Sequence, residues 1–255
     1  MRWILPAAVF FLIGSLRAEE TAAVRLADGF QCPVGSDGKS YYKARGLQPN
    51  GHLGEDWNGS EGGDTDLGAP VTATAHGIVL FARDFRLGWG NVIILRHAYM
   101  EGAQVAYVDS LYGHLNEILV REGAQVVRGQ KIGTIGNNRG MYPAHLHFEM
   151  RKNLRIGMAR SAFPRDFTTY WDPSAFIAQR LRLEGGGRIA AVPVNTFVAY
   201  TGPADLDATA SQAGGVRSPL TPYGTNPNAR PSTTSPLRPR GFKVDPFEDM
   251  RSFGY

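Results

Sequence analysis

The chain has 255 residues, 43% of them hydrophobic, which is enough for a substantial core and allows one large or two small domains. Its 27 basic and 23 acidic residues nearly balance, so composition does not indicate a nucleic-acid-binding protein, and no nucleic-acid partner is expected. The only cysteine, Cys32, excludes an intramolecular disulfide and is expected to be a buried or incidental thiol.

The N-terminus has the pattern of a secretory signal. Arg2 supplies a short basic region, residues 3–16 an apolar region, and residues 16–18 a cleavage site. The apolar region is shorter than the about 20 residues that a membrane span needs. We therefore expect a cleaved signal at residues 1–18, no stable membrane insertion after processing, and a protein in the periplasm or outside the cell. An uncleaved anchor is the alternative.

The middle of the chain predicts strands. Residues 19–44 are expected to form a short helical or irregular lead-in followed by turns. From Val71, β-branched runs alternate with glycines, at residues 71–75, 78–82, 91–97 and 103–111. Short strands with turn signals at this spacing indicate an antiparallel β architecture. Residues 120–133 add two turns between short strands, and the hairpin of a biotinyl or lipoyl carrier is a weaker interpretation of them.

The C-terminal part predicts one helix and a tail. Asp172 followed by Pro173 is a helix start, and the glycines at 185–187 are expected to end the helix. Residues 190–199 are apolar and predict either a strand or a docking peptide. From Gly202 onward the chain holds 8 of its 16 prolines, which predicts disorder. We expect a domain at residues 19–183 and a mostly disordered tail at residues 184–255.

Histidines occur in three short motifs. His52 and Asp56 form a His-x3-Asp pair, and His114 lies in a Tyr-Gly-His-Leu sequence. His145 and His147 are separated by one residue in an alternating run, which in a strand places both imidazoles on one face. The intervening Leu146 and the following Phe148 would then point into a core, as expected for a metal or catalytic strand. A surface strand with incidental histidines is the alternative.

This set of residues suits zinc. Zinc binds imidazole nitrogen and carboxylate oxygen, and a catalytic site uses three protein ligands with one open position. His52, Asp56 and one histidine of the His-Leu-His pair supply such a set, which leaves two histidines for proton transfer. A structural zinc site would instead use four protein ligands.

The three motifs, in this order and within a glycine-punctuated framework, resemble those of the lysostaphin/LytM-type zinc endopeptidases over roughly residues 45–152. The resemblance implies an antiparallel β domain with a groove. It implies one Zn²⁺ held by His52, Asp56 and His147, with His114 and His145 as catalytic histidines. Which of these two returns a proton to the leaving amine is left open.

The resemblance also suggests substrate contacts. Tyr112 matches a tyrosine that the family places beside the active site. His97 matches a histidine common in the family, although a structural hydrogen bond explains it equally well. Asn138 lies in a loop that departs from the family's usual Gly-Ser/Thr-Gly pattern. Glu149 is either a partner of a metal ligand or a member of a surface ion pair, while Trp57, Trp89 and Tyr142 line the groove or the core.

The function implied by the resemblance is zinc-dependent hydrolysis of peptide cross-links in bacterial peptidoglycan, by a monomer whose partners are the peptide stems. Many relatives have lost ligands and act as scaffolds that switch on other hydrolases. No position of the set is missing here, so a peptidase is expected and the non-catalytic module is the alternative. The scissile bond stays open between D-alanyl–diaminopimelate cross-links and glycine-rich bridges.

Overall fold

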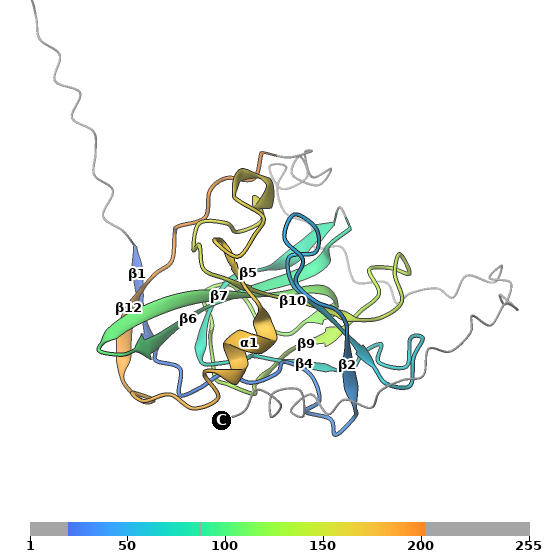
Figure 1. Cartoon of the computed structure of the whole chain (residues 1–255), viewed down its shortest axis with the longest axis horizontal. Coiled ribbons are helices and arrows are strands. Elements are labelled where there is room, and N and C mark those ends of the chain that lie inside the picture. Colours follow the sequence, from blue (N-terminus) through green and yellow to red (C-terminus); the bar gives the residue numbers. More distant parts are fainter. Residues whose placement is uncertain (1–19, 87, 202–255) are drawn as a thin grey trace, which may run out of the picture.

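The computed structural model describes residues 20–86 and 88–201, and the expected signal at 1–18 and the chain from 202 onward lie outside the described residues. The described part is built mainly of antiparallel strands and contains one short α-helix, α1 (Pro173–Ala178) (Figure 1). The prediction of a mainly antiparallel β fold with one C-terminal helix is confirmed. Within these residues, no helix has the length and apolar character needed to cross a membrane.

Most strands belong to one large sheet, in which the strand order is β2-β3-β10-β7-β6-β5-β8. In addition, β9 pairs with β7 and β4, and β11 pairs with β10. The bounds of the strands in this sheet are β2 (Tyr41–Arg45), β3 (Glu55–Gly59), β4 (Pro70–Thr72), β5 (Gly77–Arg86), β6 (Gly90–Glu101), β7 (Gln104–Ile118), β8 (Gln125–Val126), β9 (Lys131–Ile135), β10 (Leu146–Arg151) and β11 (Tyr170–Trp171). A 3-10 helix, η1 (Arg160–Ala162), lies between β10 and β11.

Strand β10 has two different faces, as the alternating sequence predicted. Leu146 and Phe148 are fully buried in the main hydrophobic core, together with Met150. His147 and Glu149 project from the other face, where they contact each other. The apolar side chains anchor the strand, so the polar face is held in a fixed register between β3 and β7.

The N-terminal lead-in forms a strand and not a helix or an irregular segment. β1 (Thr21–Arg25) pairs with β12 (Ile189–Pro193) in a separate two-stranded sheet at one end of the molecule (Figure 1). The apolar segment expected at 190–199 is therefore a strand in its first part. Val24 and Val192 pack with Ile78 and Ala98 of the large sheet. The packed chain thus continues past residue 183, where we had placed the start of the tail.

Helix α1 begins where the sequence predicted. The Asp172 side chain accepts a hydrogen bond from the Ala175 amide at 2.8 Å, and Pro173 occupies the first turn. It ends at Ala178, about two turns before the expected stop at the glycines. The amide of Phe30 donates to the carbonyl of Arg180, so tertiary contacts with the N-terminal segment replace the helical bonds that would continue α1.

Candidate metal and catalytic site

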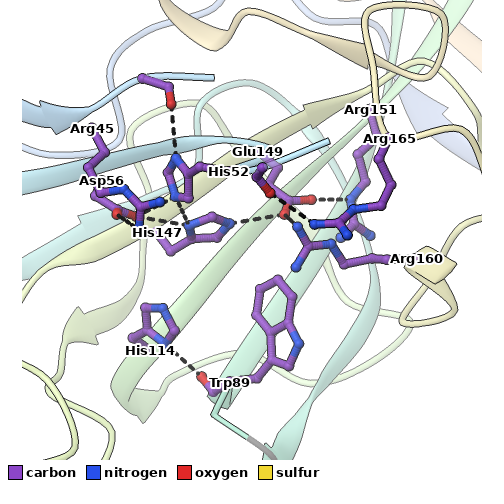
Figure 2. A network of polar contacts seen from close by, with 12 residues as sticks. Arg45, His52, Asp56, Trp89, His114, His147, Glu149, Arg151, Arg160 and Arg165 are labelled. Carbon is purple, nitrogen blue, oxygen red and sulfur yellow. Dashed lines mark hydrogen bonds and ion pairs between the residues drawn. The ribbon is translucent and has the colours of Figure 1, made fainter. Parts of the chain in front are cut away.

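Three potential metal ligands converge where β3 and β10 pair. His147 lies directly opposite Asp56 in the register, and His52 reaches the same point from the loop before β3. The Nε2 atom of His52 is 2.9 Å from Asp56 Oδ1 and 3.0 Å from His147 Nδ1, and the last two atoms are 2.9 Å apart. The structure therefore brings together the three residues expected to bind metal (Figure 2).

The donor chemistry of this triangle fits zinc. His52 Nδ1 donates to the carbonyl of Gly46 at 3.0 Å, and His147 Nε2 donates to Glu149 Oε1 at 2.9 Å. The other nitrogen of each ring faces the triangle, where it can bind a metal once it carries no proton. Two neutral imidazoles and one carboxylate are a typical catalytic zinc set, with bonds of about 2.0–2.2 Å. Among the described residues no fourth ligand joins the group, which leaves one position open.

A network of buried charges contacts His147 at Nε2, the ring nitrogen that points away from the triangle (Figure 2). The Glu149 carboxylate is fully buried and accepts from Arg151 Nε at 2.6 Å, while Arg160 Nη2 lies 3.4 Å from it. Burial alone would raise the pKa of Glu149, but the two guanidinium groups and the bond from His147 hold that pKa well below its usual range. Glu149 is thus an ionised partner that orients a ligand, and the surface ion pair considered from the sequence is wrong.

His114 enters the site through a bulge in β7. Asn91 pairs with Leu115 and Ile93 with Tyr112, so Gly113 and His114 together face a single residue of β6. The φ angle of His114 is 61°, in the left-handed region that residues other than glycine rarely adopt. A bulge of this kind redirects a side chain relative to its neighbours in the strand.

Trp89 fixes the His114 imidazole. The carbonyl of Trp89 accepts from both the backbone amide of His114, at 3.0 Å, and its Nδ1, at 3.2 Å. The Trp89 ring stacks on the imidazole with an interplanar angle of 25°. Burial lowers the pKa of His114 to about 3, helped by the nearby imidazoles of His147 and His145. The imidazole is therefore neutral near pH 7, with Nε2 free to accept a proton.

His145 lies beside His114 at the rim. The ring centroids of the two are 4.8 Å apart, and the ring of Tyr142 is near both. His145 Nδ1 donates to the carbonyl of Pro143 at 2.7 Å, which leaves Nε2, 3.9 Å from Asp56 Oδ1, as an acceptor. Both histidines expected to be catalytic thus flank the triangle of ligand atoms with one nitrogen each.

Two residues expected to contact substrate do not reach the site. His97 and Tyr112 are both fully buried on the core side of the sheet. His97 bonds the carbonyl of His76 at 2.8 Å and the hydroxyl of Ser110 at 2.7 Å. The Tyr112 hydroxyl is 3.1 Å from that of Ser110 and accepts from the amide of Thr74. These contacts give both side chains a structural role.

Asn138 does lie in an open groove. The hollow has a volume of about 370 Å³ and is bordered by residues that directly follow Trp89 and His114 in the chain. Four asparagines contribute to its wall: Asn91, Asn116, Asn137 and Asn138. Their amides both donate and accept hydrogen bonds, as the main chain of a peptide does. The groove therefore suits an extended peptide that starts beside the histidine pair.

Sequence reasoning missed the roles of Trp89 and of the backbone at Gly46. Trp89, for which the sequence allowed either groove or core, lies beside His114. Its position between two glycines is typical of a turn, but the direction of its carbonyl is seen only in the structure. Trp57, the other tryptophan considered for the groove, is 7% exposed and belongs to the core.

Comparison with known proteins places this site in a described family. Residues 51–157 match the model of peptidase family M23. Lipoprotein NlpD of Yersinia enterocolitica is 42% identical over 84 residues, which are 33% of this chain and 78% of that protein. Murein hydrolase activator NlpD of Salmonella dublin is 37% identical over 108 residues, which are 40% of this chain and 26% of that protein. The match thus spans about a quarter of the length of this second relative.

A solved structure is also similar. The solution structure of lysostaphin superimposes with a TM-score of 0.43 and 27% sequence identity, covering 60% of this chain and 55% of that one. The family expected from the three histidine motifs is the one whose model matches residues 51–157 and to which the relative in Yersinia enterocolitica points.

Proposed function

Because the chain belongs to peptidase family M23, we propose that it is a zinc-dependent endopeptidase that hydrolyses peptide cross-links of bacterial peptidoglycan. The observation that carries the proposal is the convergence of one nitrogen of His52, one oxygen of Asp56 and one nitrogen of His147 within 3.0 Å of each other. His114 and His145 stand beside this triangle with their Nδ1 atoms already engaged.

The proposed mechanism uses these two histidines for proton transfer. Zinc held by His52, Asp56 and His147 would supply a Lewis acid that activates water near pH 7. The neutral imidazole of His114 can take a proton from the attacking water at Nε2. The proton can then pass to the leaving amine nitrogen, either directly from His114 or through Nε2 of His145, which lies at the more open side. Once His145 carries a proton on Nε2, it can also donate a hydrogen bond to the carbonyl oxygen on which charge develops. Trp89 and Pro143 keep both rings in place through their carbonyls.

A direct test is to incubate the full chain with purified cross-linked muropeptides and to measure zinc in the same preparation. About one zinc per chain and the appearance of new amino termini are expected. Removal of the metal with a chelator should abolish turnover, and added zinc should restore it. A folded, zinc-loaded protein that releases no amino termini from any cross-link type would contradict the proposal.

The second candidate is a non-catalytic module that activates another hydrolase. It is favoured by the name of the relative in Salmonella dublin, a murein hydrolase activator. The complete set of ligands and flanking histidines in this chain favours the peptidase. A scaffold would stimulate a separate murein hydrolase without turnover of its own and would retain that effect after His114→Ala.

We further propose that the protein acts outside the cytoplasm, in the periplasm or beyond, as a monomer. The support is the secretory pattern of residues 1–18 and the location of the proposed substrate. Fractionation of cells and mass measurement of the mature N-terminus test the location, and sedimentation tests the monomer.

A further inference from the structure

A bulge in β2 turns Arg45 onto the face of the sheet that carries the metal ligands. In the register, Lys43 stands opposite Trp57 and Arg45 stands opposite Asp56, with one unpaired residue between the two. Successive residues of β3 point to opposite faces, and Lys43 accordingly reaches the buried Glu55 on the core side. Arg45 would have followed Lys43 to that side without the bulge. The bulge places it beside Asp56 instead.

The guanidinium of Arg45 lies at the open edge of the site. Its Nη1 is 3.7 Å from Asp56 Oδ2, the carboxylate oxygen that does not face His52 and His147, and 59% of the side chain is exposed. A guanidinium has five N–H donors, so its contact with Asp56 leaves donors that a substrate group can use. Figure 2 shows Arg45 on the Asp56 side of the site, apart from the three arginines near Glu149.

The other guanidinium groups in Figure 2 have protein partners. Arg151 and Arg160 contact the Glu149 carboxylate, and Arg160 also lies over the Trp89 ring at 4.7 Å. Arg165 donates to the carbonyl of Gly51 at 3.0 Å. Of the arginines drawn there, Arg45 is the one whose contact with the ligand set leaves it largely exposed.

The two cross-link types left open by the sequence differ in charge next to the scissile amide. In a D-alanyl–diaminopimelate cross-link, the carbon that carries the amide nitrogen also carries a free carboxylate. In a glycine bridge, that carbon leads into another uncharged peptide group. Guanidinium groups bind carboxylates through two parallel hydrogen bonds. Arg45 Nη1 lies 3.7 Å from an oxygen of Asp56, and the reacting carbonyl would bind beyond the metal that Asp56 is proposed to hold. The guanidinium and that carbonyl are therefore separated by roughly two extended residues, at about 3.3–3.6 Å each. A carboxylate on the adjacent carbon together with its hydrogen bond to the guanidinium spans about this separation.

We infer that Arg45 binds a free carboxylate on the carbon next to the scissile amide nitrogen, and that the substrates are cross-links with such a carboxylate. This inference rests on the proposed peptidase function and specifies its substrate class. Arg45 acts on the carboxylate of the amino-side residue, whereas the asparagine-lined groove beside His114 offers uncharged amides to the rest of the peptide.

The test uses two synthetic cross-linked peptides that are identical except that one has a carboxylate on this carbon and the other a carboxamide. The wild-type chain should hydrolyse the carboxylate peptide with a kcat/KM about tenfold or more above that of the carboxamide peptide. Arg45→Gln should reduce this ratio to near one, and Arg45→Lys, which keeps the charge but not the planar fork, should retain part of it.

A matched control is Arg83→Gln, which removes another exposed guanidinium, one that pairs with Glu122. This variant should keep the full ratio. Zinc content and melting temperature are measured for every variant, so that a folding defect is recognised.

Two results separate the failure of this inference from the failure of the proposed function. If the wild type hydrolyses both peptides equally, the function stands and the inference is wrong. The inference is also wrong if Arg45→Gln lowers both rates alike and weakens zinc binding, because Arg45 would then only position Asp56. If the wild type hydrolyses neither peptide nor a pentaglycine bridge, the peptidase proposal fails and the inference with it.

Discussion

Tyr112 and His114 are two residues apart in β7 but face opposite sides of the sheet. The Tyr112 ring packs against Phe148 in the core, whereas the His114 ring is 5.7 Å from that of His147 on the metal side. Regular alternation would put both side chains on one face. The bulge at Gly113 and His114, with its positive φ angle at His114, separates them.

This separation predicts different outcomes for two neighbouring substitutions. Tyr112→Phe removes a hydroxyl that accepts from the Thr74 amide at 2.9 Å, so the free energy of unfolding should fall by about 1–3 kcal/mol. Zinc content and turnover should stay as in the wild type. His114→Ala should instead lower turnover by about 10²- to 10⁴-fold with zinc still bound. Urea unfolding measures the stability of both variants, and muropeptide hydrolysis measures their turnover. If Tyr112→Phe loses turnover with unchanged stability, Tyr112 takes part in the reaction and its structural role is wrong.

The His-Leu-His strand shows how much of the site could be predicted from sequence. A period-two pattern needs only local geometry, so the shared face of His145 and His147 and the buried Phe148 were predictable. The ligand set required the resemblance in addition, because no local rule brings His52 from a loop to a strand 95 residues away.

What could not be predicted depends on irregularities of the backbone. The bulges at His114 and before Arg45 change which face a side chain occupies, and neither residue type signals them. The burial of His97 and the early end of α1 follow from tertiary contacts with Ser110 and Phe30, which no window of sequence contains. The strand β1 was missed because its partner β12 lies more than 160 residues away.

The two histidines of β10 should respond differently to removal. His147 Nδ1 belongs to the triangle of ligand atoms, so His147→Ala should lose both zinc and turnover. The His145 imidazole donates to the Pro143 carbonyl, and its Nε2 lies 3.9 Å from Asp56 Oδ1. His145→Ala should therefore keep zinc and lose about 10²- to 10⁴-fold in rate. Measuring zinc stoichiometry and turnover for both variants tests which histidine binds the metal. The assignment is inverted if His145→Ala loses its metal while His147→Ala keeps it.

Buried His97 should make stability depend on pH. Burial lowers the pKa of His97 to about 4 from an ordinary value of 6.5. Below about pH 6.5, His97 therefore becomes protonated in the unfolded chain, whereas in the folded protein it stays neutral down to about pH 4. The stabilisation is complete above pH 6.5 and decreases as the pH falls toward 4. Lowering the pH from about 7.5 to about 5 should therefore reduce the free energy of unfolding by about 2 kcal/mol through His97 alone.

Urea unfolding of metal-free wild type and His97→Gln at the two pH values isolates this contribution, since zinc release is removed and all other groups are shared. On acidification, the free energy of unfolding of the variant should fall by about 2 kcal/mol less than that of the wild type. Equal losses in both proteins would show that His97 is not the responsible group.

Two truncations should differ sharply in stability. Ending the chain after Leu183 removes β12, exposes Val24 and takes away the Pro193 carbonyl and Thr196 hydroxyl that bond the buried Arg96 at 2.6 and 2.8 Å. Each buried valine contributes about 1.5–3 kcal/mol, so a large drop in melting temperature is expected. Ending the chain after Thr201 removes only the proline-rich part and should leave the melting temperature unchanged. Similar melting temperatures for the two truncated proteins would contradict the role of β12.

The charge of Glu149 should control metal affinity through its hydrogen bond with the proposed ligand His147. Glu149→Gln preserves the shape of the side chain but replaces the carboxylate that accepts from His147 Nε2. A weaker acceptor orients the imidazole less firmly and lowers its basicity, so zinc affinity should fall about 10- to 100-fold. The same change leaves the buried Arg151 guanidinium without its counterion, which should cost about 3–5 kcal/mol of stability.

Chelator competition measures the affinity and urea unfolding the stability, with Glu117→Gln, an exposed carboxylate of β7, as the control. If Glu149→Gln binds zinc as tightly as the wild type while its stability falls, Glu149 serves the arginine network alone. The bond to His147 would then be a consequence of burial, and the orientation of this ligand would have to come from its position between β3 and β7.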